Sequence, residues 1–103
     1  MEFLVRIDFT VPAGTTDQQK NTLIAAESQR AAELAAQGVL RNLWRIPGKW
    51  SNYAIWETPD ATVLHELLTS LPLWPWASID VQPLAKHPSD PAASPSPHPN
   101  SNH

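Results

Sequence analysis

The sequence contains no cysteine. Disulfides, thiol nucleophiles and zinc–thiolate centres are therefore excluded, and cysteine usage does not report the redox compartment. The three glycines, Gly14, Gly38 and Gly48, are too far apart to form a phosphate-binding loop. There is also no HExxH motif, no GxSxG motif and no pair of histidines at helical ligand spacing. We therefore expect no metal, serine-nucleophile or nucleotide chemistry.

Basic residues and long apolar runs are also scarce. Lys and Arg number 7 and the formal net charge is −3, so the chain has no basic stripe to neutralise nucleic acid. No apolar run approaches the ~20 residues of a membrane span, and the opening MEFLVRIDF is acidic and too short for a signal peptide. We expect a cytoplasmic protein that binds neither nucleic acid nor membrane.

The composition is that of one folded domain. The chain has 103 residues, of which 42% are hydrophobic, and it carries five tryptophans. This is enough for a single core. From residue 88 onward the sequence changes to PSDPAASPSPHPNSNH, in which proline recurs and nothing can be buried. We predict a domain over 1–87 and a mobile tail over 88–103.

The first half of the domain predicts a strand, a helix and a hairpin. Residues 2–11 alternate between apolar and mixed positions, which is typical of a strand. A Thr16–Gln19 capping box and Gly38 predict a helix over 17–37. Residues 40–46 and 52–57 predict two strands joined by a hairpin centred near Lys49. With that centre, one face of the sheet carries Asn42, Trp44, Ile46, Asn52, Ala54 and Trp56, and the other carries Arg41, Leu43 and Arg45.

The second half predicts a helix and a last strand. Thr58 is expected to cap this helix with Pro59 at its first position, and Pro72 to end it. Residues 77–81 predict a short strand. The order β-α-β-β-α-β predicts an α+β fold, the ferredoxin-like plait, with a four-stranded antiparallel sheet and two helices on one face.

Such a plait leaves one face of its sheet uncovered. Apolar side chains that we expect to find exposed are Leu4, Leu43, Trp50, Trp74 and Trp76. Large exposed apolar patches usually mark association, so we predict a homo-oligomer. The alternative is that the tryptophans only cap the ends of the monomer's own core.

Glu27 interrupts the apolar stripe of the first predicted helix. It lies four residues after Leu23 and four before Ala31. Glutamate is rarely buried without a partner, so two interpretations stay open. Either its side chain reaches the rim of the helix and is hydrated, or it projects into a cavity between helix and sheet, where low polarity raises its pKa and makes it a stronger base.

Two further polar residues are candidates on their own chemistry. Asn52 can donate from its amide to a developing oxyanion, although asparagine at the start of a strand is also an ordinary turn residue. His65 lies beside the apolar stripe of the second helix, either as a boundary residue or in contact with substrate.

Four stretches resemble the muconolactone Δ-isomerase family, in this order and at these spacings: FLVRIDFTVP, LWRIPGKWSNY, SLPLWPW and DVQPLAKHP. The resemblance covers residues 1 to 88. It implies a ferredoxin-like protomer, a homodecamer with active sites at subunit contacts, no cofactor, and a place in bacterial aromatic degradation through the 3-oxoadipate pathway. The family's catalytic glutamate matches Glu27.

The resemblance also implies a reaction. Removal of the C4 proton of muconolactone gives a dienolate, and return of a proton at C2 yields 3-oxoadipate enol-lactone, so that one carboxylate serves both carbons. On this basis we assign the base to Glu27 and a hydrogen bond to the lactone oxygen to Asn52, with His65 as a second donor. Arg41 or Arg45 is expected to bind the free carboxylate of the substrate, by itself or from a neighbouring subunit.

Two other functions remain as alternatives. A chloromuconolactone dehalogenase would use the same glutamate but expel chloride instead of returning a proton. A non-catalytic plait would only bind a small hydrophobic acid, or only assemble.

Overall fold

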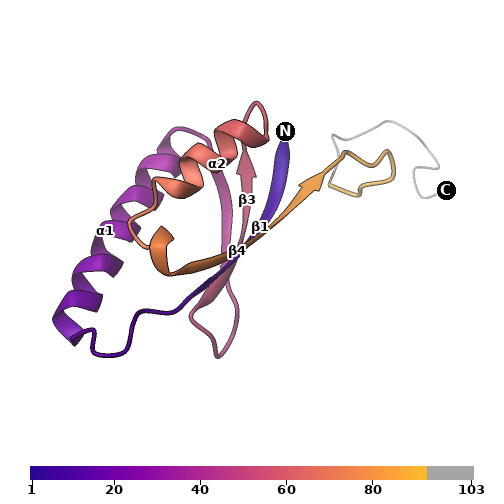
Figure 1. Cartoon of the computed structure of the whole chain (residues 1–103). Coiled ribbons are helices and arrows are strands. Elements are labelled where there is room, and N and C mark those ends of the chain that lie inside the picture. The colour runs from indigo at the N-terminus through magenta and orange to yellow at the C-terminus, as the bar shows by residue number, and fades with distance from the viewer. Residues whose placement is uncertain (93–103) are drawn as a thin grey trace.

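The computed structural model describes residues 1–92 of the chain, and the distal part of the predicted tail, residues 93–103, lies outside the described residues (Figure 1). The boundary predicted at residue 88 stays a prediction. The elements are β1 (Glu2–Phe9), α1 (Asp17–Ala36), β2 (Leu40–Arg45), β3 (Ser51–Glu57), α2 (Ala61–Thr69), the short 3₁₀ helix η1 (Trp74–Trp76) and β4 (Ala77–Leu84).

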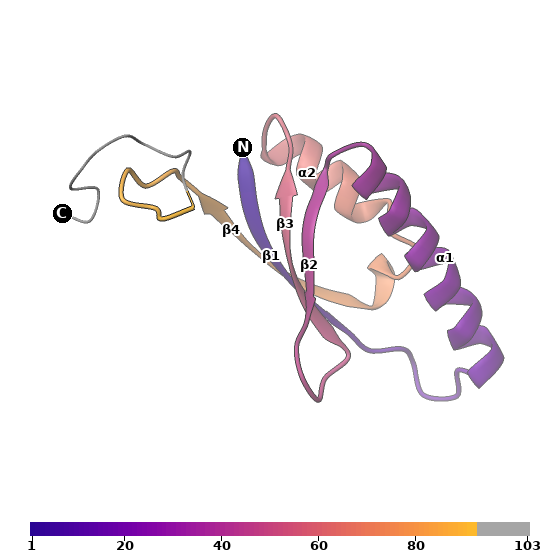
Figure 2. The same cartoon turned by 180° about the vertical axis from the view of Figure 1, so that it is seen from behind.

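The four strands form one sheet in the order β2-β3-β1-β4, and every neighbouring pair is antiparallel. Both helices lie on the same side of this sheet, as the two opposite views in Figures 1 and 2 show. The predicted ferredoxin-like plait is confirmed. One face of the sheet is covered by helices and the other is open.

The core lies between the sheet and the helices. On β1, Phe3, Val5 and Ile7 are buried and alternate with half-buried residues, because successive side chains of a strand point to opposite faces. Leu34 of α1 and Leu64 of α2 are buried against them in the same cluster. The alternation in the sequence therefore identified the covered face of β1.

Helix α1 begins as predicted and ends one residue before the predicted 37. Both halves of the capping box are present: the Gln19 N–H donates to Thr16 Oγ1 over 3.1 Å, and the Thr16 N–H donates to Gln19 Oε1 over 2.9 Å. Gly38, at φ +78°, ends the helix in the left-handed region. The predicted stripe is mostly not buried, however. Leu34 is the buried residue of α1, and Ile24 is 36% exposed.

The predicted face assignment of the hairpin is wrong for β2. Leu43 lies opposite Ala54 and Arg45 opposite Asn52, so both belong to the helix-covered face, whereas Trp44 lies opposite Tyr53 on the open face. The cause is the turn of the hairpin: Arg45 pairs with Asn52, and the Ile46 N–H donates to the Ser51 carbonyl over 3.1 Å, so the turn is centred between Gly48 and Lys49 and not at Lys49. A difference of one residue in register exchanges the two faces of a strand. A second register shift, between Leu40 and Asn42, places Leu40 opposite Trp56 on the covered face.

The predicted start of α2 is two residues too early. The N-cap is Asp60, whose side chain accepts from the Val63 N–H over 2.8 Å. Thr58 is buried instead: its N–H donates to the Met1 carbonyl over 3.0 Å, and its hydroxyl donates to the Asp60 carbonyl over 2.7 Å. Because Thr58 pairs with Met1 at the beginning of β1, it is held to the sheet and does not cap the helix. Asp60, the next residue with a suitable side chain, takes the N-cap position.

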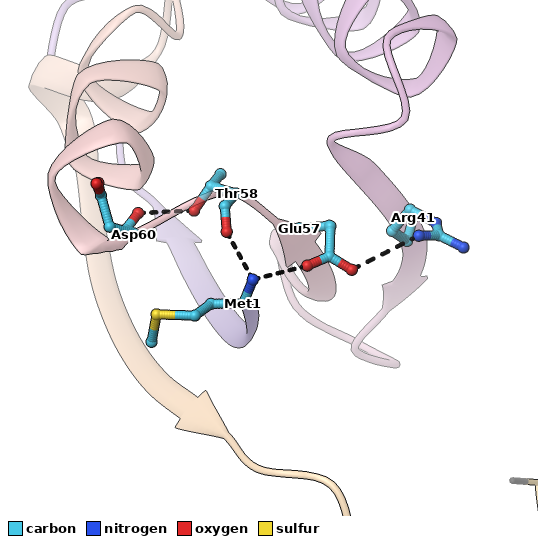
Figure 3. A network of polar contacts seen from close by, with 5 residues as sticks. All are labelled: Met1, Arg41, Glu57, Thr58 and Asp60. Atoms are coloured by element: carbon cyan, nitrogen blue, oxygen red, sulfur yellow. Dashed lines mark hydrogen bonds and ion pairs between the residues drawn. The ribbon is translucent and has the colours of Figure 1, made fainter.

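A polar network fastens the strand ends next to α2 (Figure 3). The Met1 amino group donates to the Thr58 carbonyl over 2.7 Å and to Glu57 Oε2 over 2.9 Å. Glu57 Oε1 in turn lies 3.8 Å from Nη1 of Arg41. Arg41 is thereby ion-paired at this end of the sheet, away from the β2–β3 hairpin.

The predicted apolar surface is only partly present in the single chain. Leu43 and Trp74 are 54% and 42% exposed, while Leu4, Trp50 and Trp76 are half-buried. The final strand runs to Leu84, three residues beyond the predicted end, because the whole of β1 from Glu2 to Phe9 pairs with it.

Candidate active site

A cavity of about 400 Å³ lies between α1 and the covered face of the sheet. It explains why the middle of α1 buries so little, since that part stands over the cavity. The α1 residues Ile24, Glu27, Ser28, Ala31 and Leu34 form one wall. The other walls come from the sheet, the hairpin and the segment before η1: Ile7, Phe9, Leu40, Leu43, Trp44, Arg45, Trp50, Ser51, Asn52, Ala54, Trp56, Leu71 and Leu73.

Glu27 projects into this cavity and does not lie on the rim of the helix. Its carboxylate is half-buried, and Oε1 accepts one hydrogen bond, of 3.0 Å, from the Leu73 N–H. Burial raises the pKa of Glu27, and the Leu73 N–H acts in the opposite direction with a smaller effect. Within residues 1–92 no cation pairs with this carboxylate. Glu27 is therefore a stronger base than an exposed glutamate.

The backbone that holds Glu27 comes from a distant part of the chain. Leu73 lies between α2 and η1 and is buried. Two turn hydrogen bonds fix this segment, from the Trp74 N–H to the Leu71 carbonyl over 2.9 Å and from the Trp76 N–H to the Leu73 carbonyl over 3.0 Å. The Leu73 N–H is thus presented to Glu27 by a rigid turn. Nothing in the local sequence around either residue indicates this contact.

Arg45 and Asn52 lie directly opposite each other on β2 and β3, and both border the cavity. Within the described part of the chain Arg45 forms no ion pair, so its guanidinium can bind an added anion. The Asn52 side-chain oxygen is buried and has no hydrogen-bond partner among residues 1–92. The structure therefore brings Glu27, Asn52 and Arg45, three of the predicted site residues, to one cavity.

His65 and Arg41 are not brought to this cavity. His65 is exposed on α2. Arg41, besides its ion pair with Glu57, borders a second and smaller hollow of about 280 Å³ beside α1 and β2. In the single chain, neither residue lies among those that surround Glu27.

Two features of the cavity were not assigned a role from the sequence. The indole N–H of Trp56, a residue 3% exposed, is buried without a hydrogen-bond partner among residues 1–92. Leaving such a donor unpaired costs about 1–3 kcal/mol. At the hairpin end, the Trp50 ring lies 5.3 Å from that of Phe9, and the Lys20 ammonium lies 4.5 Å from the Trp50 centroid. The position of Trp50 in the cavity wall could have been predicted from its place in the hairpin. Its contact with Lys20 of α1 could not.

Across residues 1–92, no three His, Cys, Asp or Glu side chains are grouped so that they could hold a metal ion. In the same part of the chain, neither helix has the length and hydropathy needed to cross a membrane. The polar side chains that border the cavity include the Glu27 carboxylate, the Asn52 amide and the Arg45 guanidinium.

These features define an α+β plait with a carboxylate-bearing cavity between its first helix and its sheet. The chain belongs to the muconolactone delta-isomerase family, whose family model matches residues 1–90. The muconolactone Delta-isomerase of Pseudomonas aeruginosa is 38% identical over 89 residues, which is 86% of this chain and 93% of that protein. The muconolactone Delta-isomerase of Rhodococcus opacus is 39% identical over 88 residues, 85% of this chain and 95% of that protein.

Solved structures agree with the fold. A crystal structure of muconolactone isomerase matches with a TM-score of 0.82 at 36% identity, over 87% of this chain and 94% of that one. A 5-chloro-2-hydroxyhydroquinone dehydrochlorinase from Burkholderia phenoliruptrix, solved with 2,5-dihydroxybenzoquinone, matches with a TM-score of 0.61 at 16% identity, over 84% of this chain and 96% of that one. At that identity the second likeness concerns the fold alone.

Proposed function

We propose that this protein is a muconolactone Δ-isomerase, which converts muconolactone to 3-oxoadipate enol-lactone by proton transfer without a cofactor. The observation that carries the proposal is the half-buried Glu27, whose pKa is raised by burial inside the cavity. Membership of the muconolactone delta-isomerase family supplies the substrate.

The geometry around Glu27 suits a base that moves a proton between two carbons. One oxygen is held by the Leu73 N–H over 3.0 Å, which fixes the side chain while the other oxygen remains available. The C4 proton of muconolactone is acidified through the conjugated lactone carbonyl. Glu27 takes this proton, and the resulting dienolate recovers it at C2. Because the same carboxylate acts as base and then as acid, its raised pKa favours both steps.

The ends of the substrate differ in charge, and so do the residues proposed to bind them. Arg45 pairs with the free carboxylate, for which its guanidinium is suited by bidentate geometry. Asn52 donates its amide N–H to the lactone group. The position of both residues on the cavity wall supports these roles.

We propose in addition that the protein is a homo-oligomer, the decamer that the family resemblance implies, in the cytoplasm. The exposed Leu43, Trp44 and Trp74 support association, because they are large apolar side chains left in contact with water in the single chain. Sedimentation velocity of the purified protein tests this assembly, and a monomer at micromolar concentration would contradict it.

The activity is tested by incubating the purified protein with muconolactone in heavy water and following the product by NMR. We expect conversion to enol-lactone, with deuterium at C2 in the fraction of turnovers in which the Glu27 carboxyl proton exchanges with solvent during the lifetime of the bound dienolate. A parallel incubation with 5-chloromuconolactone measures chloride. Chloride release without isomerisation of muconolactone would assign the protein to the dehalogenases, and no conversion of either lactone would leave only a binding role.

A further inference from the structure

We propose that Arg30, through its contact with Ser70, is a positioning residue that holds Glu27 in place for catalysis. The contact fixes the middle of α1 relative to residues 70–73, the segment between α2 and η1 that supplies the Leu73 N–H. The inference rests on the proposed isomerase function for the role of Glu27. Neither Arg30 nor Ser70 borders the cavity, so we expect neither to touch the substrate.

The first argument is how little packing fixes the middle of α1. Leu34, near the end of the helix, is its buried residue, and the cavity lies beneath the turns that carry Glu27 and Ala31. Near the start of the helix, the Lys20 ammonium lies 4.5 Å from the centroid of the Trp50 ring. Between these two ends the helix has few apolar neighbours beneath it, and packing positions a helix only where atoms are in contact. Polar contacts to a neighbouring segment therefore matter more at this point.

Two side chains of α1 make such contacts, and they are three residues apart. Glu27 Oε1 accepts from the Leu73 N–H over 3.0 Å. Arg30 Nε and Nη2 donate to Ser70 Oγ over 3.2 and 3.1 Å. Among the hydrogen bonds and ion pairs of residues 1–92, no others join α1 to the part of the chain from α2 to β4. Because Ser70 lies three residues before Leu73, the two contacts close a ring between the helix and the segment.

Ser70 is itself firmly held. It is the C-cap residue of α2, and its hydroxyl and its N–H both donate to the Leu67 carbonyl, over 2.6 and 3.1 Å. The hydroxyl proton is thus used within α2, and the oxygen is left to accept from Arg30. Leu71 and Leu73 are 4% and 1% exposed, so the residues after Ser70 are anchored in the core. Arg30 therefore ties α1 to a segment of fixed position.

The same contact directs the charge of Arg30 away from the base. Residues three apart on a helix are neighbours, so the guanidinium could reach either Glu27 or Glu33. In the structure Nη1 pairs with Glu33 over 3.1 Å, while Nε and Nη2 bind Ser70. Apart from Glu27, Arg45 of β2 is the charged residue that borders the cavity, and the residues that β1, β3 and the segment before η1 contribute are uncharged. Glu27 is thus held by a neighbouring N–H and not by a cation.

The kinetic test replaces Arg30 by Met, which keeps a flexible unbranched stem but cannot bind Ser70. We expect kcat to fall about 5- to 50-fold, because a displaced base loses its alignment with the substrate C–H. KM should stay within about threefold, since the lost contact is made only within the protein. Ser70→Ala should have the same effect, and the double variant should be no slower than either single one, because both changes break one interaction.

Two control variants keep the interaction. Ser70→Thr retains the hydroxyl at an exposed position and should retain kcat. Glu33→Gln retains an acceptor for Nη1 and leaves the contact with Ser70 intact, so it should retain kcat as well. A loss of kcat in Ser70→Thr as large as in Ser70→Ala would contradict the proposal, because the effect would then come from packing around Ser70.

The amide proton of Leu73 reports the hydrogen bond to Glu27 without turnover, since its NMR signal shifts when the acceptor carboxylate ionises. We expect this signal to titrate with Glu27 in the unchanged protein. In Arg30→Met the size of the shift should fall by at least about half, because the N–H and the carboxylate move apart. The midpoint should move to higher pH, because the Leu73 N–H lowers the pKa of Glu27.

The outcomes are distinct. A kcat of Arg30→Met within twofold of the unchanged protein would overturn the positioning role, and so would a Leu73 signal that titrates in this variant with its full shift. If the unchanged protein does not isomerise muconolactone, the proposed function fails. The Leu73 titration then still decides whether Arg30 positions Glu27.

Discussion

Glu27 and Asp8 lie on opposite sides of the same sheet, and their surroundings shift their pKa values in opposite directions. Glu27 faces the covered side, where burial raises its pKa and the Leu73 N–H is its partner. Asp8 lies on the open side, where Arg6 donates to both of its oxygens over 3.0 and 3.1 Å and Ser51 donates a third hydrogen bond. These contacts, with Arg6 first, lower the pKa of Asp8.

The difference separates a reactive carboxylate from a structural one. Asp8 is half-buried and its carboxylate is paired, and the Arg6 guanidinium also lies 5.6 Å from the centroid of the Tyr53 ring. On the covered side, by contrast, the buried Asn52 oxygen and Trp56 indole N–H have no partner among residues 1–92, and Glu27 accepts one hydrogen bond, from Leu73. Polar groups that are withdrawn from water and incompletely paired cost stability, and proteins retain them mainly where they act on a ligand.

The largest expected effect comes from removing the charge of Glu27. We expect Glu27→Gln to lower kcat by about 10²- to 10⁴-fold, while the fold is retained because the amide oxygen can still accept from Leu73. Glu33→Gln, on the same helix but in an exposed pair with Arg30, is the matched control and should retain activity. Initial rates of muconolactone isomerisation are compared for the two variants. Equal losses of activity in both would contradict a specific role for Glu27.

Arg45 tests whether the covered side also supplies the charge that binds substrate. We expect Arg45→Gln to raise KM by about 10- to 100-fold, the range for loss of a charge-assisted hydrogen bond, with a smaller change in kcat. Arg41→Gln is made in parallel and should change KM little, because Arg41 pairs with Glu57 at the other end of the sheet. The reverse result would show that a neighbouring subunit brings Arg41 to the site.

A substitution of Asp8 tests the role of the carboxylate on the open face of the sheet. We expect Asp8→Asn to lower the melting temperature at pH 7 and to leave kcat close to that of the unchanged protein. Since the pKa of Asp8 is lowered in the folded state, its contribution to stability is present above the ordinary aspartate value and is lost as pH falls through the folded value. The difference in melting temperature should therefore vanish in acid. Asp80→Asn, at an exposed position opposite Arg6, is the control for loss of a surface charge.

The smallest expected effect is on the stability of Glu27→Gln. Because the folded state raises the pKa of Glu27, wild-type stability is favoured when this group is protonated and declines as pH rises through the folded value. The glutamine variant should melt at the same or a slightly higher temperature at pH 8, and the two proteins should converge toward pH 4. A variant that is less stable throughout would mean that the cavity prefers the charged form.

The sequence predicted much of the fold because its signals are local. The Thr16–Gln19 box and Gly38 predicted both ends of α1 to within one residue, since caps are satisfied by residues three or four positions away. The alternation in β1 predicted its covered face. The start of α2 was missed because Thr58 is engaged by Met1, a residue 57 positions away.

The site was predicted less completely, and for the same reason. Glu27 was singled out because a carboxylate breaks an apolar stripe, which is visible within one helix. The faces of Leu43, Trp44 and Arg45 were predicted wrongly, because the hairpin turn is centred between Gly48 and Lys49 and not at Lys49, which shifts their register against β3 by one residue. The unpaired N–H of Trp56 could not be predicted, since it depends on which acceptors the fold brings near it, and none lies within reach among residues 1–92.

The sequence by itself determined the order of elements, the main helix ends and the presence of one misplaced charge, because these follow from periodicity and capping over a few residues. Only the tertiary structure decided that α1 stands over a cavity, that a turn before η1 presents its N–H to Glu27, and that Arg45 joins Asn52 on the covered face. Burial and pairing arise between segments far apart in the chain, and the chemistry of the site depends on both.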